Sequence, residues 1–570
     1  MKKIGIFGKA IAIIIALASL LSIFAACKQD KEDGPSPEDN KELLDISGYT
    51  IVRYDKSDSS ITKKTSKMKA AIKSTLGLDL SVQTDWYNPN NAPDPNAKEI
   101  LIDQTNRKES ADALAKLEEK ETDAYIIDIT ENKIVIVGKT DYSTLRGITY
   151  FIKNYVTISP KGSKLDTAHG KSVIQDYTAI KNISIDGMLD MDIEVMSTVL
   201  ASEQKVSNTL GYTATLDHVY FPSVIELQHQ PNEEDNGTLI AAMSIGETPA
   251  GGPMSSLGCI MKSVDNGKTW KIIFRPTETF KPWFWAGQMS HIYELPEKVG
   301  DMPAGTLIYS ANTVNYSMYS HIGVWRSFDC GKTWKQYTIV AEGGGLKEGV
   351  WEPVMFYDNG YLYCFYSDDS NRKYDQRIVY KRSKDGVNWE SAVNVCAFNN
   401  FGERPGMPII TKMGNGEYFL VYEFCGEGHD CFIYYKTTKD ITKWNPTDPG
   451  TLLSAKVNGA DYTMASSPTC VWTPAGGECG TLFAMGRREF GGDKTIRMYV
   501  SFDYGKTWTT MENPLPYKWY NSAVAGNDSI GYRSIMVLGA DPSVIHYVSI
   551  TNVGYVKGSQ VQYARLKLYD

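Results

Sequence analysis

Ser263-Val264-Asp265-Asn266-Gly267-Lys268-Thr269-Trp270 is the first of four copies of one turn signature in this chain. The other copies are Ser327-Phe-Asp329-Cys-Gly331-Lys-Thr333-Trp334, Ser383-Lys-Asp385-Gly386-Val-Asn-Trp389 and Ser501-Phe-Asp503-Tyr-Gly505-Lys-Thr507-Trp508. An aspartate carboxylate can accept hydrogen bonds from turn N–H groups, a glycine can adopt positive φ, and a tryptophan can pack against a neighbouring sheet. The signature therefore predicts a tight turn between two strands, with a structural role.

The spacing of these turns predicts the architecture. The aspartates at positions 265, 329, 385 and 503 are 64, 56 and 118 residues apart, and the last interval is twice 59. Thr438-Lys-Asp440-Ile-Thr-Lys-Trp444 fits this gap as a degraded copy without the glycine. Repeats of about sixty residues with short alternating strands are typical of four-stranded propeller blades. We therefore predict a mainly β fold with a six-bladed β-propeller over residues 183–570, and the turns resemble the Asp-boxes, or BNR repeats, of sialidase-like propellers.

The N-terminus predicts export and a lipid anchor. Lys2, Lys3 and Lys9 precede an apolar run, which ends in small residues before Cys27. This pattern resembles a bacterial lipoprotein signal peptide (residues 1–26), in which Cys27 becomes lipid-modified after cleavage. The polar residues that follow, to about position 42, predict a flexible tether. We expect a membrane-anchored protein on the extracytoplasmic side of the envelope.

A small α+β domain is predicted over residues 43–178. Strand patterns at 49–54, 99–103, 123–128 and 133–138 alternate with amphipathic helix patterns at 65–76, 110–120 and 142–154. The stretch Glu99-Ile-Leu-Ile-Asp-Gln-Thr-Asn-Arg107-Lys-Glu-Ser110 resembles the accessory domain of several glycoside hydrolases, which implies a spacer or accessory role.

The composition of the chain limits the kinds of partner and cofactor that we expect. The net charge of −8 argues against a nucleic-acid partner. Apart from Cys27, the eight cysteines show no CxxC spacing, so no zinc site is predicted, and no cofactor is expected. Cys425 with Cys431, and Cys470 with Cys479, are close enough in sequence for bridges, but the pairing does not follow from the sequence.

Strand order predicts which rim of the propeller carries the catalytic residues. If the boxed turn joins the third and fourth strands of each blade, first strands begin, and second strands end, at the opposite rim. Glu352 and Arg404 lie near the starts of two first strands, and Asp368 and Glu423 lie near the ends of the corresponding second strands. These four side chains should therefore share one rim on two adjacent blades.

The same residues carry a family resemblance. Trp351-Glu352-Pro353, Phe365-Tyr366-Ser367-Asp368, Arg404-Pro405-Gly406-Met407, Asn415-Gly416-Glu417-Tyr418 and Tyr422-Glu423 resemble glycoside hydrolase family 93. The resemblance, over about residues 215–540, implies a retaining exo-arabinanase on a six-bladed propeller that releases arabinobiose from α-1,5-L-arabinan. The two catalytic glutamates of the family fall on Glu352 and Glu423.

Retaining hydrolysis itself requires such a pair: one carboxylate attacks the anomeric carbon and one carboxylic acid protonates the departing oxygen, with the groups about 5–5.5 Å apart. Aromatic or proline neighbours flank both glutamates and favour a raised pKa. The sequence therefore does not decide which of Glu352 and Glu423 is the nucleophile.

Further candidates for sugar contact lie near this rim. Asp217 and His218 precede the first strand of the first blade, and Arg404 and either Arg487 or Arg488 are candidates for hydroxyl binding or for holding a carboxylate. The predicted substrate-binding set is Asp217, His218, Asp368, Arg404 and Arg488. Trp283, Trp285 and Trp519 are candidate stacking walls or core residues.

Two alternatives to an arabinanase remain open. A sialidase needs three arginines around the substrate carboxylate, yet no arginine occurs between Arg146 and Arg275, where the first would be expected. A non-catalytic glycan-binding propeller would keep the boxed turns and need neither glutamate. A polysaccharide or oligosaccharide is the partner expected in every case.

Overall fold

The computed structural model describes residues 43–569 apart from 88–91, 121–122, 158–163, 178–180, 186–187, 202–204, 208–212, 250–254, 277–284, 316–318, 346, 401, 427, 491–494, 518–529 and 552–558. The predicted signal peptide, Cys27 and the tether lie outside this range. Within the described residues no helix is both long enough and apolar enough to cross a bilayer.

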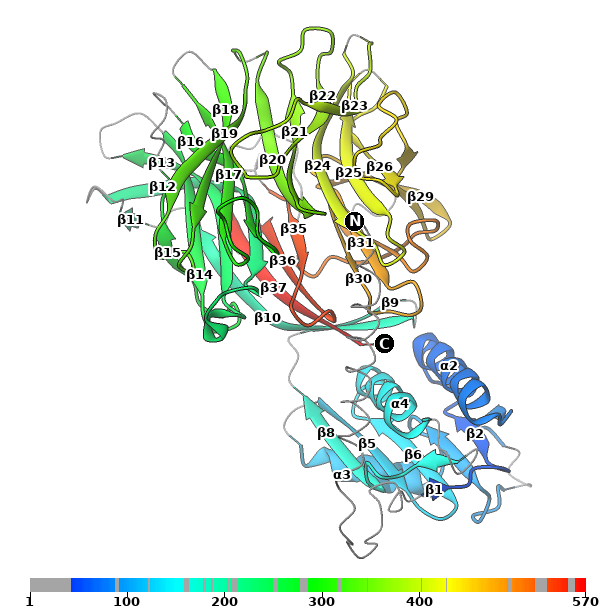
Figure 1. Cartoon of the computed structure of the whole chain (residues 1–570). Helices are drawn as coiled ribbons and strands as arrows, with labels where there is room; N and C mark the ends of the chain where they lie inside the picture. The colour runs from blue at the N-terminus through cyan, green and yellow to red at the C-terminus, as the bar shows by residue number, and fades with distance from the viewer. Residues whose placement is uncertain are drawn as a thin grey trace, which may run out of the picture.

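Residues 43–177 form a six-stranded sheet covered by helices (Figure 1). The strand order is β3(Ser81–Thr84), β2(Thr50–Arg53), β4(Glu99–Ile102), β6(Lys133–Gly138), β5(Asp123–Ile129) and β8(Ser172–Tyr177), and β3, β2, β4 and β6 are parallel. The helices are α2(Ser59–Leu76), α3(Lys108–Glu118) and α4(Asp141–Tyr155), and the short strands β1(Leu43–Leu44) and β7(Leu165–Asp166) pair beside them. The strands and helices predicted for this segment are present.

The two faces of this sheet have separate cores because side chains alternate along a strand. Apolar side chains of α2 and α4 pack on one face, around Ile51 and Ile100, while α3 packs on the other, around Val52 and Leu101. Charged contacts join α2 and α4 to strand β10(Leu189–Ala201), including a 3.5 Å ion pair between Lys64 and Asp190 in which both side chains are buried.

The β-rich remainder of the chain has a propeller arrangement (Figure 1). One sheet combines the chain's C-terminal strands β35(Ile535–Leu538), β36(Val544–Thr551) and β37(Gln560–Tyr569) with β10(Leu189–Ala201) and β9(Lys181–Ile185). Because β37 pairs with β10 along their length, the end of the chain is hydrogen-bonded to the beginning of this part.

The other sheets follow in chain order. A nine-stranded sheet contains β11(Lys205–Ser207), β12(Thr213–Glu226), β13(Leu239–Pro249), β14(Ser255–Ser263), β15(Lys271–Phe274), β16(Trp285–Glu294), β17(Leu307–Val314), β18(Ser320–Ser327) and β19(Lys335–Glu342), with a 3₁₀ turn at Glu233–Asp235. A four-stranded sheet contains β20(Val350–Asp358), β21(Tyr361–Asp368), β22(Arg377–Ser383) and β23(Val393–Cys396).

Two sheets complete the series. A seven-stranded sheet contains β24(Arg404–Lys412), β25(Tyr418–Cys425), β26(Phe432–Thr438), β27(Thr451–Leu452), β28(Ser454–Val457), β29(Ala460–Ala465) and β32(Arg488–Phe490). The last, four-stranded, contains β30(Thr469–Thr473), β31(Thr481–Met485), β33(Arg497–Ser501) and β34(Thr509–Glu512).

The sheet count differs from the predicted six four-stranded blades: the described strands from Lys181 to Tyr569 form five sheets. The difference arises in the nine-stranded sheet, where one parallel bridge between Leu257 and Ala286 joins two antiparallel units, β11–β15 and β16–β19. A sequence repeat of about sixty residues, the length of one blade, does not predict such a bridge, because the bridge depends on how closely two units approach.

The boxed turns have the predicted construction. In the first, Asp265 accepts hydrogen bonds from the Thr269 N–H at 2.9 Å and from the Thr269 hydroxyl at 2.6 Å, and these bonds lower the pKa of Asp265 to about 2. The degraded copy closes similarly, since the Trp444 indole donates to the Ile441 carbonyl at 2.7 Å, as Trp270 does to Gly267 at 3.1 Å. These turns join the third and fourth strands of their units.

Of the two disulfide bridges that the cysteine spacing allows, one is present in the structure. Cys425 and Cys431 are bridged, whereas Cys470 and Cys479 are free thiols.

Candidate active site

Six inner strands, β12, β16, β20, β24, β30 and β35, surround a channel, and each has a non-glycine residue in the left-handed region within or just before it. These residues are Phe221, Met289, Glu352, Met407, Ser467 and Arg533, with φ between 49° and 58°. In β12, β16, β20 and β24 the pairing register shifts at this point, which marks a bulge. A bulge bends the strand and redirects a side chain, so one of these bulges determines the position of Glu352.

A polar side chain from the preceding unit caps three of these bulges. The N–H groups of Met289, Glu352 and Met407 donate to Ser244 Oγ at 2.9 Å, Asn312 Oδ1 at 2.9 Å and Ser367 Oγ at 3.0 Å. The turn before β30 has the same contact with a different acceptor, because the Ser467 N–H donates to Glu423 Oε2 at 2.9 Å. Glu423 thus occupies a capping position that elsewhere holds Ser or Asn.

Glu352 is held from both its backbone and its side chain. The Ser367 hydroxyl donates to its Oε2 at 2.7 Å, and Asn312, which is completely buried, binds its N–H and also donates to the Val350 carbonyl. The side chain of Glu352 is partly exposed, yet loss of surrounding water raises its pKa, and the nearby charge of Arg533 opposes this rise.

Glu423 lies within electrostatic range of Glu352. Desolvation, followed by the negative charge of Glu352, raises the pKa of Glu423 to about 7, although the Ser467 N–H opposes the shift. Met407 links the two carboxylates: its N–H binds the serine that holds Glu352, and its sulfur is 3.4 Å from the hydroxyl of Ser467. The structure therefore brings together the two glutamates that the sequence singled out, and desolvation raises the pKa of both.

Arg533 is a site residue that sequence reasoning missed. It is 1% exposed, and its Nη2 donates to the Pro353 carbonyl at 3.3 Å, directly behind Glu352. Its Nη1 has no hydrogen-bond partner among the described residues, and desolvation lowers its pKa to about 10. No motif surrounds Arg533 in the sequence, and the only available signal is its distance from Ser467, about one repeat.

The second aspartate of Asp368-Asp369, rather than the first, lies beside Arg404. Asp368 forms an ion pair with Arg377 at 2.7 Å, away from the glutamates. Asp369 accepts from the Trp351 indole at 3.1 Å and pairs with Arg404 at 3.3 Å, and burial raises its pKa to about 6. Side chains at consecutive strand positions point to opposite faces, which separates the two carboxylates.

The adjacent residues Arg487 and Arg488 likewise have different surroundings. Arg487 donates to the Ile530 carbonyl at 2.7 Å, and its charge is near enough to lower the pKa of Glu423. Arg488 instead donates to the Asp430 carbonyl at 3.2 Å and lies over the Phe490 ring. Five further candidates have side chains outside the described residues: Asp217, His218, Trp283, Trp285 and Trp519.

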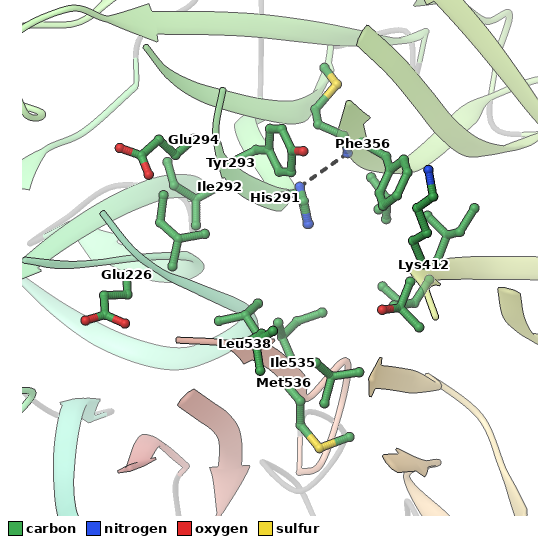
Figure 2. A pocket seen from close by; sticks show the side chains of 18 of the residues that line it. Glu226, His291, Ile292, Tyr293, Glu294, Phe356, Lys412, Ile535, Met536 and Leu538 are labelled. Carbon is green, nitrogen blue, oxygen red and sulfur yellow. Dashed lines mark hydrogen bonds between the residues drawn. The ribbon is translucent and has the colours of Figure 1, made fainter. Parts of the chain in front are cut away.

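The channel along the propeller axis is a separate feature (Figure 2). Its volume is about 420 Å³, its wall is mainly aliphatic, and neither Glu352 nor Glu423 lines it. His291 lies at its wall, accepting from the Met355 N–H at 3.3 Å, and desolvation lowers its pKa to about 3, so it is neutral. No group of three His, Cys, Asp or Glu side chains able to hold a metal occurs in the described part of the chain.

Strand pairing places the boxed turns away from the glutamates. In β20–β22, Trp351 pairs with Ser367 at one end, whereas Leu362, near the other end of β21, pairs with Ser383 of the boxed turn. The chemistry at Glu352 and the turn at Asp385 therefore lie at opposite ends of the same unit.

The propeller part of the chain is similar to known proteins. Residues 318–542 match the model of a BNR repeat-like domain, and no curated protein matches the chain. The structure of the GH93 α-L-arabinofuranosidase of Fusarium graminearum with arabinobiose is 25% identical, with a TM-score of 0.52, over 65% of this chain and 97% of that one.

The Penicillium chrysogenum α-L-arabinanase complexed with arabinobiose has the same identity and TM-score, over 65% of this chain and 98% of that one. This chain is therefore similar to arabinose-active propeller enzymes along nearly their whole length.

Proposed function

We propose that this protein is a retaining glycoside hydrolase that acts on arabinose-containing glycans, most directly as an exo-enzyme on α-1,5-L-arabinan. The observation that carries this proposal is the pair Glu352 and Glu423, which interact electrostatically but differ in their environments. The likeness to arabinanases that bind arabinobiose supports the substrate class.

The different surroundings of the two glutamates support an assignment of roles. Desolvation raises the pKa of Glu352, but the charge of Arg533 and the Ser367 hydroxyl favour its ionised form, so we assign Glu352 as the nucleophile, whose carboxylate attacks the anomeric carbon. A pKa of about 7 keeps Glu423 protonated under mildly acidic conditions, so it donates its proton to the departing glycosidic oxygen. The Glu423 carboxylate then removes a proton from water, which hydrolyses the glycosyl–Glu352 ester with net retention.

A sialidase reaction has less support. Arg533 lies behind Glu352, but at 1% exposure its guanidinium is not accessible to a substrate carboxylate. Arg404 is already paired with Asp369.

The test is incubation of the protein with linear α-1,5-arabinan and, separately, with sialyl-lactose, followed by chromatography of the products. We expect arabinobiose from arabinan, no release of sialic acid, and initial formation of the α-anomer by NMR. Glu352→Gln and Glu423→Gln should abolish release, while Glu390→Gln, at a half-exposed surface ion pair, should not. Absence of arabinose products with the folded wild-type protein would refute the proposal.

We further propose that Cys27 carries a lipid anchor, so that the propeller works outside the cytoplasm on polysaccharide brought to the cell surface. The signal-like residues before Cys27 and the polar stretch after it support this location.

A further inference from the structure

A second cavity lies far from the glutamates, at the carboxyl ends of parallel strands β2, β3 and β4. Its volume is about 410 Å³, and residues that follow these strands line it, among them Tyr54, Asp85, Trp86 and Asn106. Strand β2 pairs with β3 on one side and β4 on the other, so the loops after β2 and β4 diverge here. Such a switch point at the carboxyl edge of a parallel sheet is where open α/β sheets bind ligands.

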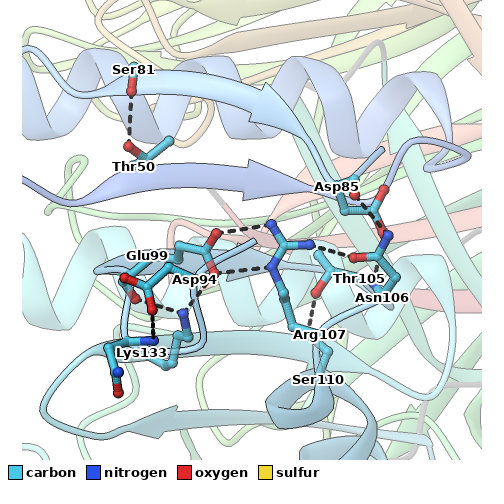
Figure 3. Close-up of polar contacts among 12 residues, drawn as sticks. Thr50, Ser81, Asp85, Asp94, Glu99, Thr105, Asn106, Arg107, Ser110 and Lys133 are labelled. Carbon is cyan, nitrogen blue, oxygen red and sulfur yellow. Dashed lines mark hydrogen bonds and ion pairs between the residues drawn. The ribbon is translucent and has the colours of Figure 1, made fainter. Parts of the chain in front are cut away.

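Hydrogen bonds join the loops that line this cavity. Asp85, 2% exposed, accepts from the N–H groups of Asp55 at 2.8 Å and Asn106 at 2.7 Å, and thereby joins the three loops. The Asn106 amide donates back to the Asp85 carbonyl at 2.8 Å (Figure 3). Behind it, Arg107 forms two hydrogen bonds with Glu99, which also pairs with buried Lys133 at 2.8 Å. A site with fixed walls binds at a lower entropic cost.

Two aromatic side chains that line the cavity are exposed to solvent rather than packed in the core. Trp86 is 71% exposed and Tyr87 is 38% exposed, and both line the cavity. Exposed aromatic rings next to polar groups provide an apolar face for a ligand with polar edges.

The chemistry of the loops argues against a phosphate-like ligand. The loop after β2 reads Tyr54-Asp55-Lys56-Ser57-Asp58 and has no glycine to bring backbone N–H groups to a phosphate. Asp58 caps α2 through the Ser60 N–H at 2.7 Å, so a carboxylate already occupies the helix N-terminus. The ligand that fits is uncharged, carries hydroxyl groups and has an apolar face.

We propose that this cavity is a binding site for a neutral glycan, with Trp86 as the stacking platform and the polar groups of Asp55, Lys56 and Tyr87 contacting sugar hydroxyls. The site would hold polysaccharide while the propeller acts on a chain end. It does not depend on arabinan being the substrate, because any neutral glycan presents the same alternation of apolar face and hydroxyl edge.

The test is affinity electrophoresis of the full-length, Glu352→Gln protein in gels that contain linear arabinan, arabinoxylan, galactan or mixed-linkage β-glucan. We expect at least one glycan to retard the protein and Trp86→Ala to weaken that binding about tenfold, a typical loss for an aromatic anchor. Trp86→Tyr should restore most of the retardation. Phe328→Ala, a half-exposed aromatic on a boxed turn, is the matched control and should leave binding unchanged.

In the otherwise wild-type protein, Trp86→Ala should leave hydrolysis of short soluble substrates unchanged and slow only hydrolysis of the polymer that binds. Failure of all four glycans to bind, or retardation that Trp86→Ala does not reduce, would overturn the proposal. Loss of binding to anionic phospholipid vesicles in Trp86→Ala, without loss of glycan binding, would instead identify a membrane-contacting surface. Trp86-dependent binding together with inactivity on arabinan would refute the proposed function and leave this site standing.

Discussion

The protonation of Glu423 should control the alkaline side of the pH profile. With a pKa of about 7, roughly half of the Glu423 side chains carry a proton at pH 7, whereas at the ordinary value of 4.5 about one in 300 would. The surroundings of Glu423 therefore increase the population of competent acid by about two orders of magnitude at neutral pH. Activity should be present below pH 7 and should fall about tenfold per pH unit above pH 8.

The variant Glu423→Gln keeps the shape of the side chain but cannot donate a proton. Loss of a general acid costs about 10²- to 10⁴-fold, so kcat/KM on arabino-oligosaccharides should fall by this factor. On an aryl arabinobioside with a good leaving group the first step should be affected much less, and the alkaline decline should disappear. Azide should rescue Glu423→Ala with retained configuration, and Glu352→Ala with inverted configuration.

The assay is kcat/KM against pH from 4 to 10 for both substrates and both proteins. Because the two carboxylates interact, the limbs report apparent pKa values of the pair. A decline near pH 7 that persists in Glu423→Gln on the oligosaccharide would refute the assignment of Glu423 as the acid. Near-wild-type turnover of that variant, with folding confirmed by circular dichroism, would refute the proposed mechanism.

Three other predictions test the fold around the site and the anchor. Asn312→Ala leaves the Glu352 N–H without its acceptor, so it should destabilise the protein by about 1–3 kcal/mol and lower kcat more than it changes KM; exposed Asn415→Ala is the control, and equal melting temperatures would contradict it. Asp329→Asn should lower the melting temperature at pH 7, and the difference should shrink as the pH falls below 4, because hydrogen bonds hold the pKa of Asp329 below its ordinary value; a difference that does not vary with pH would count against this. Cys27→Ala should abolish lipid labelling and release the protein from the membrane fraction, and unchanged membrane retention would exclude the anchor.

Local contacts explain why the sequence predicted the turns. The Asp265 carboxylate and the Thr269 groups that bind it are four residues apart, so one short stretch contains the whole interaction. The repeat of these turns then predicted a propeller arrangement and the relative places of Glu352 and Glu423, because strand direction alone determines which ends share a rim. These inferences depend on order along the chain rather than on packing.

The electrostatics of the site depend on contacts that only the tertiary structure creates. Arg533 lies 181 residues after Glu352, and Asn312 lies 40 residues before it, so neither contact has a local signature. Likewise, which of two adjacent residues faces the glutamates, Asp368 or Asp369, and Arg487 or Arg488, depends on strand register. A pKa depends on burial and on charges from distant segments, and for that reason the sequence could pair the two glutamates, whereas their different surroundings exist only in the folded chain.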